Sequence, residues 1–318
     1  LISAEVNELG AALVTSKKED DTFDLAHWGK EGMQNLSPLW LLKYLPNMLA
    51  CHVTIVHDCR GPSNTITCCE AASGLSIAES RRVIQRGDAD ACLSGGAEDR
   101  VNPLALYRQH CTGRLAETDG SGNPSEFVQP FASQSNGTII GEGGGILLIE
   151  SKTSCEARSG NMWCTIDGIG CKQSNGDSPL DIDGHALETA IGKALREANC
   201  NAPDIDVIVP LGSGIPSLDA AEHGALQQVF GDSLQSIPTI TTIPYTGNCM
   251  AGNGAIAIGV AAKALREQTI PARLGANETK GIAANACDST SSAINRVLVM
   301  SPSEGGQCVA MVLGRADA

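Results

Sequence analysis

Residues 61–98 read GPSNTITCCEAASGLSIAESRRVIQRGDADACLSGGAE, and their alternation of local patterns indicates the fold class. Residues 60–69 combine a turn with β-branched side chains and predict a strand. The small and apolar side chains of residues 71–85 predict a helix that ends at Gly87, a favoured helix-terminating residue. Residues 89–93 predict a short strand closed by Gly95 and Gly96. A strand, a helix and a strand in succession predict a mainly parallel sheet with helices on its faces.

The rest of the first half gives weaker patterns. Residues 36–50 hold two prolines among apolar residues and predict a broken helix. Residues 102–135 predict an irregular region with a turn at 118–123. Three further segments predict strands, namely residues 9–15, the β-branched run 53–57, and residues 137–150, which predict two strands joined by a glycine turn.

The second half repeats the order of the first. Its hallmark is a long helix of small residues, GNCMAGNGAIAIGVAAKALR, which is suited to burial on all sides. This repetition predicts two pseudo-duplicated halves, residues 1–155 and 156–318. The predicted elements are strands at 163–170, 205–210 and 239–243, helices at 183–198, 220–230 and 247–266, and a closing hairpin of 297–300 with 309–313.

Composition narrows the class of protein. The chain has 318 residues, a net charge of −14 and only 3% aromatic residues, so its core must be aliphatic. This acidity disfavours binding to nucleic acid or an anionic membrane, which requires a basic surface. No apolar run reaches the roughly 18–20 residues of a membrane helix, and no signal peptide is visible, so we expect a cytoplasmic protein. The 13 cysteines, without a CxxC pair, favour buried free thiols over a disulfide framework or a zinc site, and no metal or cofactor is expected.

Four segments together resemble the β-ketoacyl synthases of the thiolase superfamily. They are GPSNTITCCEAASGL, GDADACLSGGAE, GEGGGILLIE and LGSGIPSLDAAE, which follow the family's order and spacing. The resemblance implies an α/β thiolase fold, with two related halves packed as a five-layer α-β-α-β-α sandwich. It also implies an opening strand and helix, expected before Leu1 and missing from this sequence. Members of this family dimerise through the strand and helix around the nucleophile, which implies an interface at residues 65–85.

The resemblance further implies where catalytic residues belong. The family uses a nucleophilic cysteine at the start of a buried helix, two histidines and a lysine. The nucleophile position is Glu70, the histidine positions are Leu211 and Asn248, and the lysine position is Ile243. The phenylalanine that gates the active site in the family corresponds to Glu304. A carboxylate forms no productive thioester, and neither leucine nor asparagine shuttles protons near neutral pH as histidine does, so we expect condensation to be lost.

The replaced positions resemble the chain-length factors of two-component ketosynthases, in which the nucleophile is typically glutamine. The run TGRLAETD and the GEGGG turn also resemble that branch. This implies a non-condensing subunit that pairs with an active ketosynthase, or with itself as a dimer, and handles chains bound to acyl carrier protein. Two alternatives remain open. The first is an active 3-oxoacyl synthase with Cys68 or Cys69 as a displaced nucleophile, and the second is a scaffold that binds acyl carrier protein or a lipid.

The remaining polar residues and the glycine turn are interpreted one by one. Glu70 has either an acid–base role or a structural one, paired with a buried arginine or a helix N-terminus. Asp219 is interpreted as a helix cap and the charged residues 17–21 as a solvated loop. The glycine turn at residues 142–145 does not open a helix, which argues against a phosphate site. The six histidines lack metal-ligand spacing and are interpreted as ordinary surface or core residues.

Overall fold

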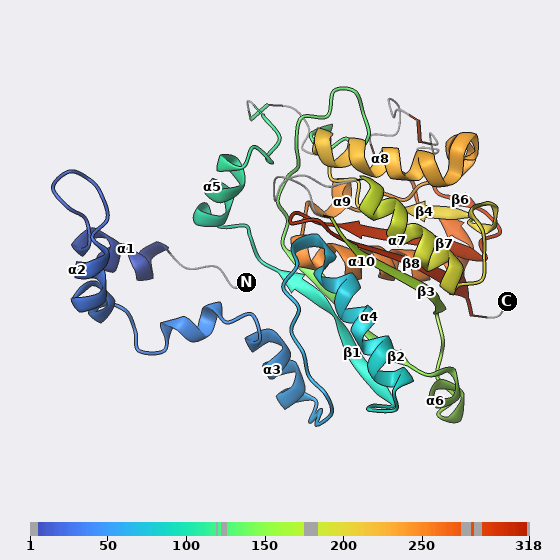
Figure 1. The fold of residues 1–318 in the computed structure, drawn as a ribbon, viewed down its shortest axis with the longest axis horizontal. Coiled ribbons are helices and arrows are strands. Elements are labelled where there is room, and N and C mark those ends of the chain that lie inside the picture. Colours follow the sequence, from blue (N-terminus) through green and yellow to red (C-terminus); the bar gives the residue numbers. More distant parts are fainter. Residues whose placement is uncertain are drawn as a thin grey trace.

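The computed structural model describes residues 6–118, 120–121, 126–174, 184–274, 281–282 and 288–316. Helices and sheets stack in layers, while the helices nearest the N-terminus extend away from this body (Figure 1). The helices are α1 Val6–Thr15, α2 Leu25–Lys30, α3 Met48–Val56, α4 Ala72–Gln85, α5 Pro103–Cys111, α6 Lys152–Ala157, α7 Gly184–Glu197, α8 Pro216–Phe230, α9 Ile243–Thr246 and α10 Asn253–Glu267. The strands are β1 Ala91–Glu98, β2 Gly143–Glu150, β3 Cys164–Gln173, β4 Val207–Val209, β5 Thr269–Ile270, β6 Thr290–Ser291, β7 Arg296–Pro302 and β8 Gln307–Arg315.

The larger sheet has the strand order β3-β8-β7-β4. β7 and β8 form the predicted hairpin, with Val299 opposite Met311, and β4 lies parallel to β7. Every residue of β4 and all but the outermost residues of β7 and β8 are buried, because helices cover both faces. The aliphatic side chains of these strands therefore form the core around this sheet.

β1 and β2 form a separate antiparallel pair, with Leu93 opposite Leu148. The prediction of two strands within residues 137–150 was wrong, because Gly143, Gly144 and Gly145 lie inside the single strand β2, whose partner is β1. β1 likewise continues through Gly96 instead of ending there, since the absence of a side chain lets the backbone pass the start of α10. A Cβ at Gly96 would lie 2.4 Å from the carbonyl oxygen of Ala251.

The helices α4 and α10 lie between the two sheets and contact each other. Their small residues permit this close approach, since a Cβ on Gly254 would lie 3.0 Å from the Cβ of Ser73. The helix predicted at residues 71–85 is confirmed, and Gly87 follows it with φ of +78°. Both helices begin in the same way, with a 3₁₀ turn (Cys69–Ala71 or Met250–Gly252) whose first residue has a positive φ.

Helices α7 and α8 cover the outer face of the larger sheet and contact each other (Figure 1). The strand β3 approaches α7 closely because it contributes glycines at the contact. A Cβ at Gly170 would lie 1.8 Å from the carbonyl oxygen of Ala190, and backbone atoms cannot rotate out of the way as a side chain can.

We therefore expect Gly170→Ala to destabilise the protein by about 2–3 kcal/mol, because the added methyl group overpacks this contact. Urea unfolding followed by circular dichroism measures the change. Gly192→Ala, on α7 itself, is the control and should stabilise by about 0.5 kcal/mol through helix propensity. Equal effects of the two substitutions would contradict the overpacking argument.

Several local predictions were wrong where pairing partners decide the outcome. Residues 9–15 lie in α1 and residues 53–57 in α3, so neither is a strand. Residues 60–68 form no strand, and residues 239–243 make only a single bridge between Thr239 and Ile208 before α9 begins. β-branched side chains favour a strand only where a neighbouring strand accepts their backbone hydrogen bonds.

Two broader predictions also need correction. The region predicted as irregular contains α5, and its predicted turn at residues 118–123 lies largely outside the described residues. The sheets are mostly antiparallel, because only β4 and β7 form a parallel ladder among the named strands. The helix prediction at residues 183–198 and the strand predictions at 163–170 and 205–210 are confirmed within a few residues.

Candidate functional site

Glu70, the residue expected at the nucleophile position, lies at the start of α4, between the two sheets. Glu70 belongs to the 3₁₀ turn that precedes this helix, and its side chain is fully buried. Its Oε1 atom accepts hydrogen bonds from Nη2 of Arg114 and from Nδ2 of Asn248, the latter at 3.4 Å. Its Oε2 atom accepts the backbone N–H of Glu304 at 3.4 Å. The start of α4 also favours a negative charge, because the first N–H groups of a helix point outward along its dipole.

Arg114 is the residue that the sequence analysis did not single out, although it lies in the TGRLAETD run. It joins Glu70 to Glu304 through two ion pairs and is only 5% exposed. Burial lowers the pKa of this guanidinium, but the two carboxylates outweigh burial and raise the pKa above its ordinary value. A cationic partner for Glu70 was predictable in principle, since a buried glutamate requires a cation. The sequence offered no way to choose among 22 Lys and Arg residues.

Asn248, which the resemblance predicts at the second histidine position, is part of a hydrogen-bond network that holds the start of α10. Its Oδ1 atom accepts the backbone N–H of Met250 at 2.9 Å and Nδ2 of Asn253 at 2.7 Å. The Oδ1 atom of Asn253 in turn accepts the N–H of Cys249 at 2.8 Å. Asn248 thus fixes the turn that leads into α10 and donates to Glu70, but it has no group that titrates near neutral pH.

The two other residues expected at catalytic positions, Leu211 and Ile243, are apolar. Leu211 and Ile243 belong to one buried cluster with Val128, and their side chains are 5% and 1% exposed. Neither side chain has an atom that donates a proton or a hydrogen bond. The structure therefore gathers Arg114, Asn248 and Glu304 around Glu70, whereas Leu211 and Ile243 lie in an aliphatic cluster.

Two buried carboxylates organise the loop that carries Leu211. Glu222 accepts the N–H groups of Leu211 and Gly212 at 2.8 and 2.9 Å, and Asp219 accepts those of Ser213 and Phe131. The interpretation of Asp219 as a helix cap was wrong, because Ile215 is the N-cap of α8 and Asp219 lies within its first turn. Burial raises the pKa of Asp219 to about 6 and that of Glu222 to about 8, against the opposing effect of the N–H donors.

The two adjacent cysteines, Cys68 and Cys69, directly precede Glu70, and the pKa values of both thiols are raised. Burial and the neighbouring charges of Glu70 and Glu304 raise the pKa of Cys69 to about 11, and burial raises the pKa of Cys68. The thiolate is the reactive form of cysteine, so both thiols are weakly nucleophilic near neutral pH.

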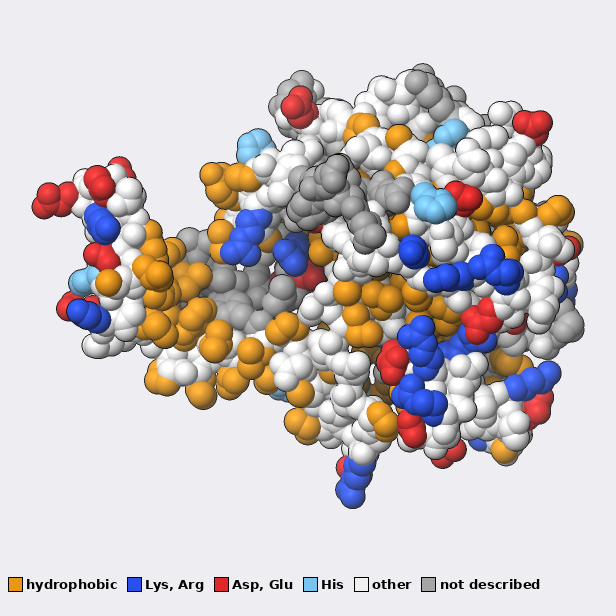
Figure 2. Space-filling model, viewed as in Figure 1, with side chains coloured by type: hydrophobic (Ala, Val, Ile, Leu, Met, Phe, Trp, Pro, Cys, Tyr) orange, Lys and Arg blue, Asp and Glu red, His pale blue; other side chains and the backbone are white. Residues whose placement is uncertain are grey.

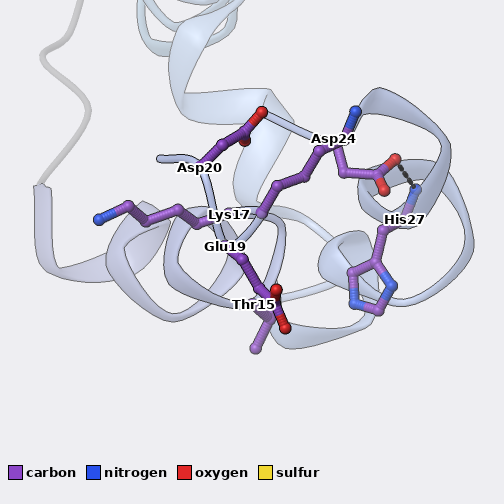
Figure 3. A pocket seen from close by; sticks show the side chains of 7 residues that line it. Thr15, Lys17, Glu19, Asp20, Asp24 and His27 are labelled. Atoms are coloured by element: carbon purple, nitrogen blue, oxygen red, sulfur yellow. Dashed lines mark hydrogen bonds between the residues drawn. The ribbon is translucent and has the colours of Figure 1, made fainter. Parts of the chain in front are cut away.

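An open hollow of about 600 Å³ lies far from these residues, on the α1–α2 arm (Figure 3). Its lining carries both signs of charge, from Lys17 and Lys18 and from Glu19, Asp20 and Asp24. Lys17 forms an ion pair with Asp21 at 2.6 Å, and both side chains are more than half exposed. This surface fits the interpretation of a solvated charged loop.

Within the described ranges, no helix combines the length and apolarity that crossing a membrane requires. In the same ranges, no group of three or more His, Cys, Asp and Glu side chains is arranged to hold a metal ion.

A layered α/β fold with two buried helices, α4 and α10, between its sheets is typical of a ketosynthase-like protein. Comparison with family models finds the β-ketoacyl synthase N-terminal domain over residues 5–154 and the β-ketoacyl synthase C-terminal domain over residues 163–277. The chain belongs to the β-ketoacyl synthase family.

Two curated relatives illustrate the range of the family. The 3-oxoacyl-[acyl-carrier-protein] synthase 2 of Staphylococcus aureus is 28% identical over 258 residues, which cover 79% of this chain and 62% of that protein. The actinorhodin polyketide putative beta-ketoacyl synthase 2 of Streptomyces coelicolor is 33% identical over 224 residues, which cover 70% of this chain and 53% of that protein. The chain thus matches a little over half the length of these relatives.

Solved structures establish the thiolase fold. A ketosynthase in complex with its type II polyketide acyl-carrier protein has a TM-score of 0.86 at 20% identity, covering 96% of this chain and 74% of that one. The ishigamide ketosynthase/chain length factor has a TM-score of 0.79 at 23% identity, covering 97% of this chain and 72% of that one.

Proposed function

We propose that this chain is a non-condensing subunit, similar to a chain-length factor, that pairs with an active ketosynthase in fatty-acid or polyketide assembly. The observation that carries the proposal is the state of Glu70. It fills the nucleophile position, is fully buried and is held by Arg114, Asn248 and the backbone of Glu304. None of these contacts is a histidine, so Glu70 is neither a thiol nucleophile nor hydrogen-bonded to a side chain that shuttles protons near neutral pH.

Exposed apolar surface supports the pairing with another subunit. α3 has no buried residue, and Ile55 and Val56 are each 75% exposed on it. The following residues 60–65 are exposed as well, and they lead directly to Glu70. Figure 2 shows hydrophobic side chains gathered over this side of the molecule. A large exposed apolar surface is typical of a protein–protein interface, so we propose that α3 and residues 60–85 contact the ketosynthase partner.

Two structural neighbours support this role over a generic one. One structural neighbour is a ketosynthase/chain length factor, and another is a ketosynthase bound to its acyl-carrier protein. By this likeness we infer acyl carrier protein as the second partner and the cytoplasm as the location of the assembly. The competing interpretation, a synthase with Cys68 or Cys69 as nucleophile, is disfavoured by the raised pKa values of both thiols.

The test is intact-protein mass spectrometry after incubation with acyl- and malonyl-carrier protein, with an active ketosynthase as the positive control. We expect no acyl adduct and no decarboxylation of the malonyl group, because Glu70 cannot form the thioester. An adduct that disappears in Cys69→Ala or Cys68→Ala would overturn the proposal and establish a displaced nucleophile. Co-expression with a candidate ketosynthase should then yield a stable heterodimer by size-exclusion chromatography. Tight binding of an acyl chain without any partner would instead support the scaffold interpretation.

A further inference from the structure

The turn between β7 and β8 lies against the nucleophile position. Gly305 and Gly306 have φ of +87° and +83°, which allows the hairpin to reverse within Ser303–Gln307. The N–H of Ser303 donates to the carbonyl of Gln307 at 2.9 Å. The far side of the turn is held by Gln173, whose Nε2 donates to the carbonyl of Gly305 at 2.7 Å. The near side of the turn presents Glu304 to the buried site.

Glu304 makes two interactions with that site. Its backbone N–H donates to Glu70, and its carboxylate pairs with Arg114. The side chain of Glu304 is 25% exposed, whereas those of Glu70 and Arg114 are 0% and 5% exposed. Glu304 therefore closes the solvent side of a charge cluster whose other two members are buried.

Arg114 is itself held in place by backbone hydrogen bonds. Its N–H donates to the carbonyl of Gln109 at 3.2 Å, and its carbonyl accepts the N–H of Thr138 at 2.8 Å. The guanidinium is therefore presented from a braced segment, and it connects three separate parts of the chain: the start of α4, the β7–β8 turn and the segment after α5. We name this connection the Glu70–Arg114–Glu304 bridge.

We propose that the Glu70–Arg114–Glu304 bridge locks the turn of residues 303–306 over the nucleophile position, so that this site is filled by the protein's own ion pairs and stays closed to acyl chains. The inference rests on the proposed function, because a condensing subunit would have to admit an acyl chain to this position in every cycle. It goes further in assigning Arg114 as the positioning residue and the turn as a fixed closure.

Hydrogen exchange on the full chain tests the lock at the turn. In Arg114→Met and Glu304→Gln, we expect the amides of residues 303–306 to exchange at least about tenfold faster than in the unmodified protein, because local opening becomes easier. Arg81→Met is the matched control, since Arg81 also forms a partly buried ion pair, with Glu197, but lies away from the turn. Unchanged exchange at the turn in both bridge variants, with α4 still protected, would overturn the proposal.

Arg114→Met leaves a buried carboxylate without its cation and is the variant at risk of unfolding. The double variant Glu70→Gln with Arg114→Met removes the bridge without that unpaired charge. Faster exchange confined to the turn in the double variant supports the lock. Exchange equal to the unmodified protein in a folded double variant overturns it.

Alkylation of Cys69 by iodoacetamide gives a second readout of closure. Arg114 lowers the pKa of Cys69, so its removal makes the thiolate scarcer and by itself slows alkylation. Alkylation of Cys69 that is several-fold faster in Arg114→Met therefore reports access to the site and not ionisation. Slower alkylation in a folded Arg114→Met variant contradicts the lock.

The two proposals fail in different measurements. An acyl adduct on the unmodified protein contradicts the non-condensing function, and it also shows that the closed turn admits acyl chains. Absence of an adduct together with unchanged hydrogen exchange in the bridge variants contradicts only the lock. An adduct on Cys69 that appears only in the bridge variants supports the lock and shows that closure suppresses a residual acyl transfer.

Discussion

Arg114→Met should lower the free energy of unfolding by about 3–5 kcal/mol, the range expected when one partner of a buried ion pair is removed. The reason is that Glu70 is fully buried and loses its cation, while the replacement side chain cannot neutralise it. Glu304 contributes less, because its side chain is 25% exposed and water replaces part of the lost interaction. Urea unfolding at neutral pH, monitored by circular dichroism, measures the loss.

Two variants separate charge from packing in this prediction. Glu70→Gln with Arg114→Met should recover most of the loss, because an amide is far less costly to bury than a carboxylate. Arg81→Met should cost no more than about 1 kcal/mol, since its ion pair with Glu197 is partly solvated. A loss in Arg114→Met as small as that in Arg81→Met would contradict the bridge as a stabilising feature.

Glu222 should make the protein less stable as pH rises through the range around 8. Burial raises the pKa of this carboxyl to about 8 in the folded protein, whereas in the unfolded chain it ionises near its ordinary value of 4.5. The folded state thus retains a proton that the unfolded state has lost, so stability falls with rising pH. Between about pH 6 and about pH 9 we expect this group to remove roughly 3 kcal/mol from the free energy of unfolding.

Glu222→Gln isolates that effect, because glutamine is neutral at every pH. The variant should be less stable than the unmodified protein at acidic pH, since its amide group cannot accept both N–H bonds that Glu222 accepts. Its own stability should lack the decline that ionisation of Glu222 causes, so the two curves converge as pH rises toward about 8. Asp219→Asn is the control, because a pKa of about 6 confines its contribution to more acidic conditions. Parallel curves for Glu222→Gln and the unmodified protein between about pH 6 and about pH 8 would refute the assignment.

Elements with a strong internal pattern were predictable from the sequence. The small-residue helices α4 and α10 and the β7–β8 hairpin carry their own signals in helix composition, glycine termination and turn residues. The strands predicted at residues 9–15 and 53–57 were wrong, since apolar and β-branched runs of that length suit a helix equally well. The pairing of β1 with β2 spans more than forty intervening residues, and local pattern does not identify such partners.

The sequence by itself determined the family and an aliphatic core suited to a layered α/β fold, and the resemblance to that family predicts the loss of the cysteine, both histidines and the lysine at the catalytic positions. These follow from residue identity and spacing, which do not depend on how distant segments meet. Only the tertiary structure decided which residues surround Glu70. Arg114 reaches Glu70 and Glu304 across 44 and 190 residues of chain, respectively, and Asn248 reaches Glu70 across 178. A buried charge demands a partner, but which residue supplies it depends on three-dimensional packing.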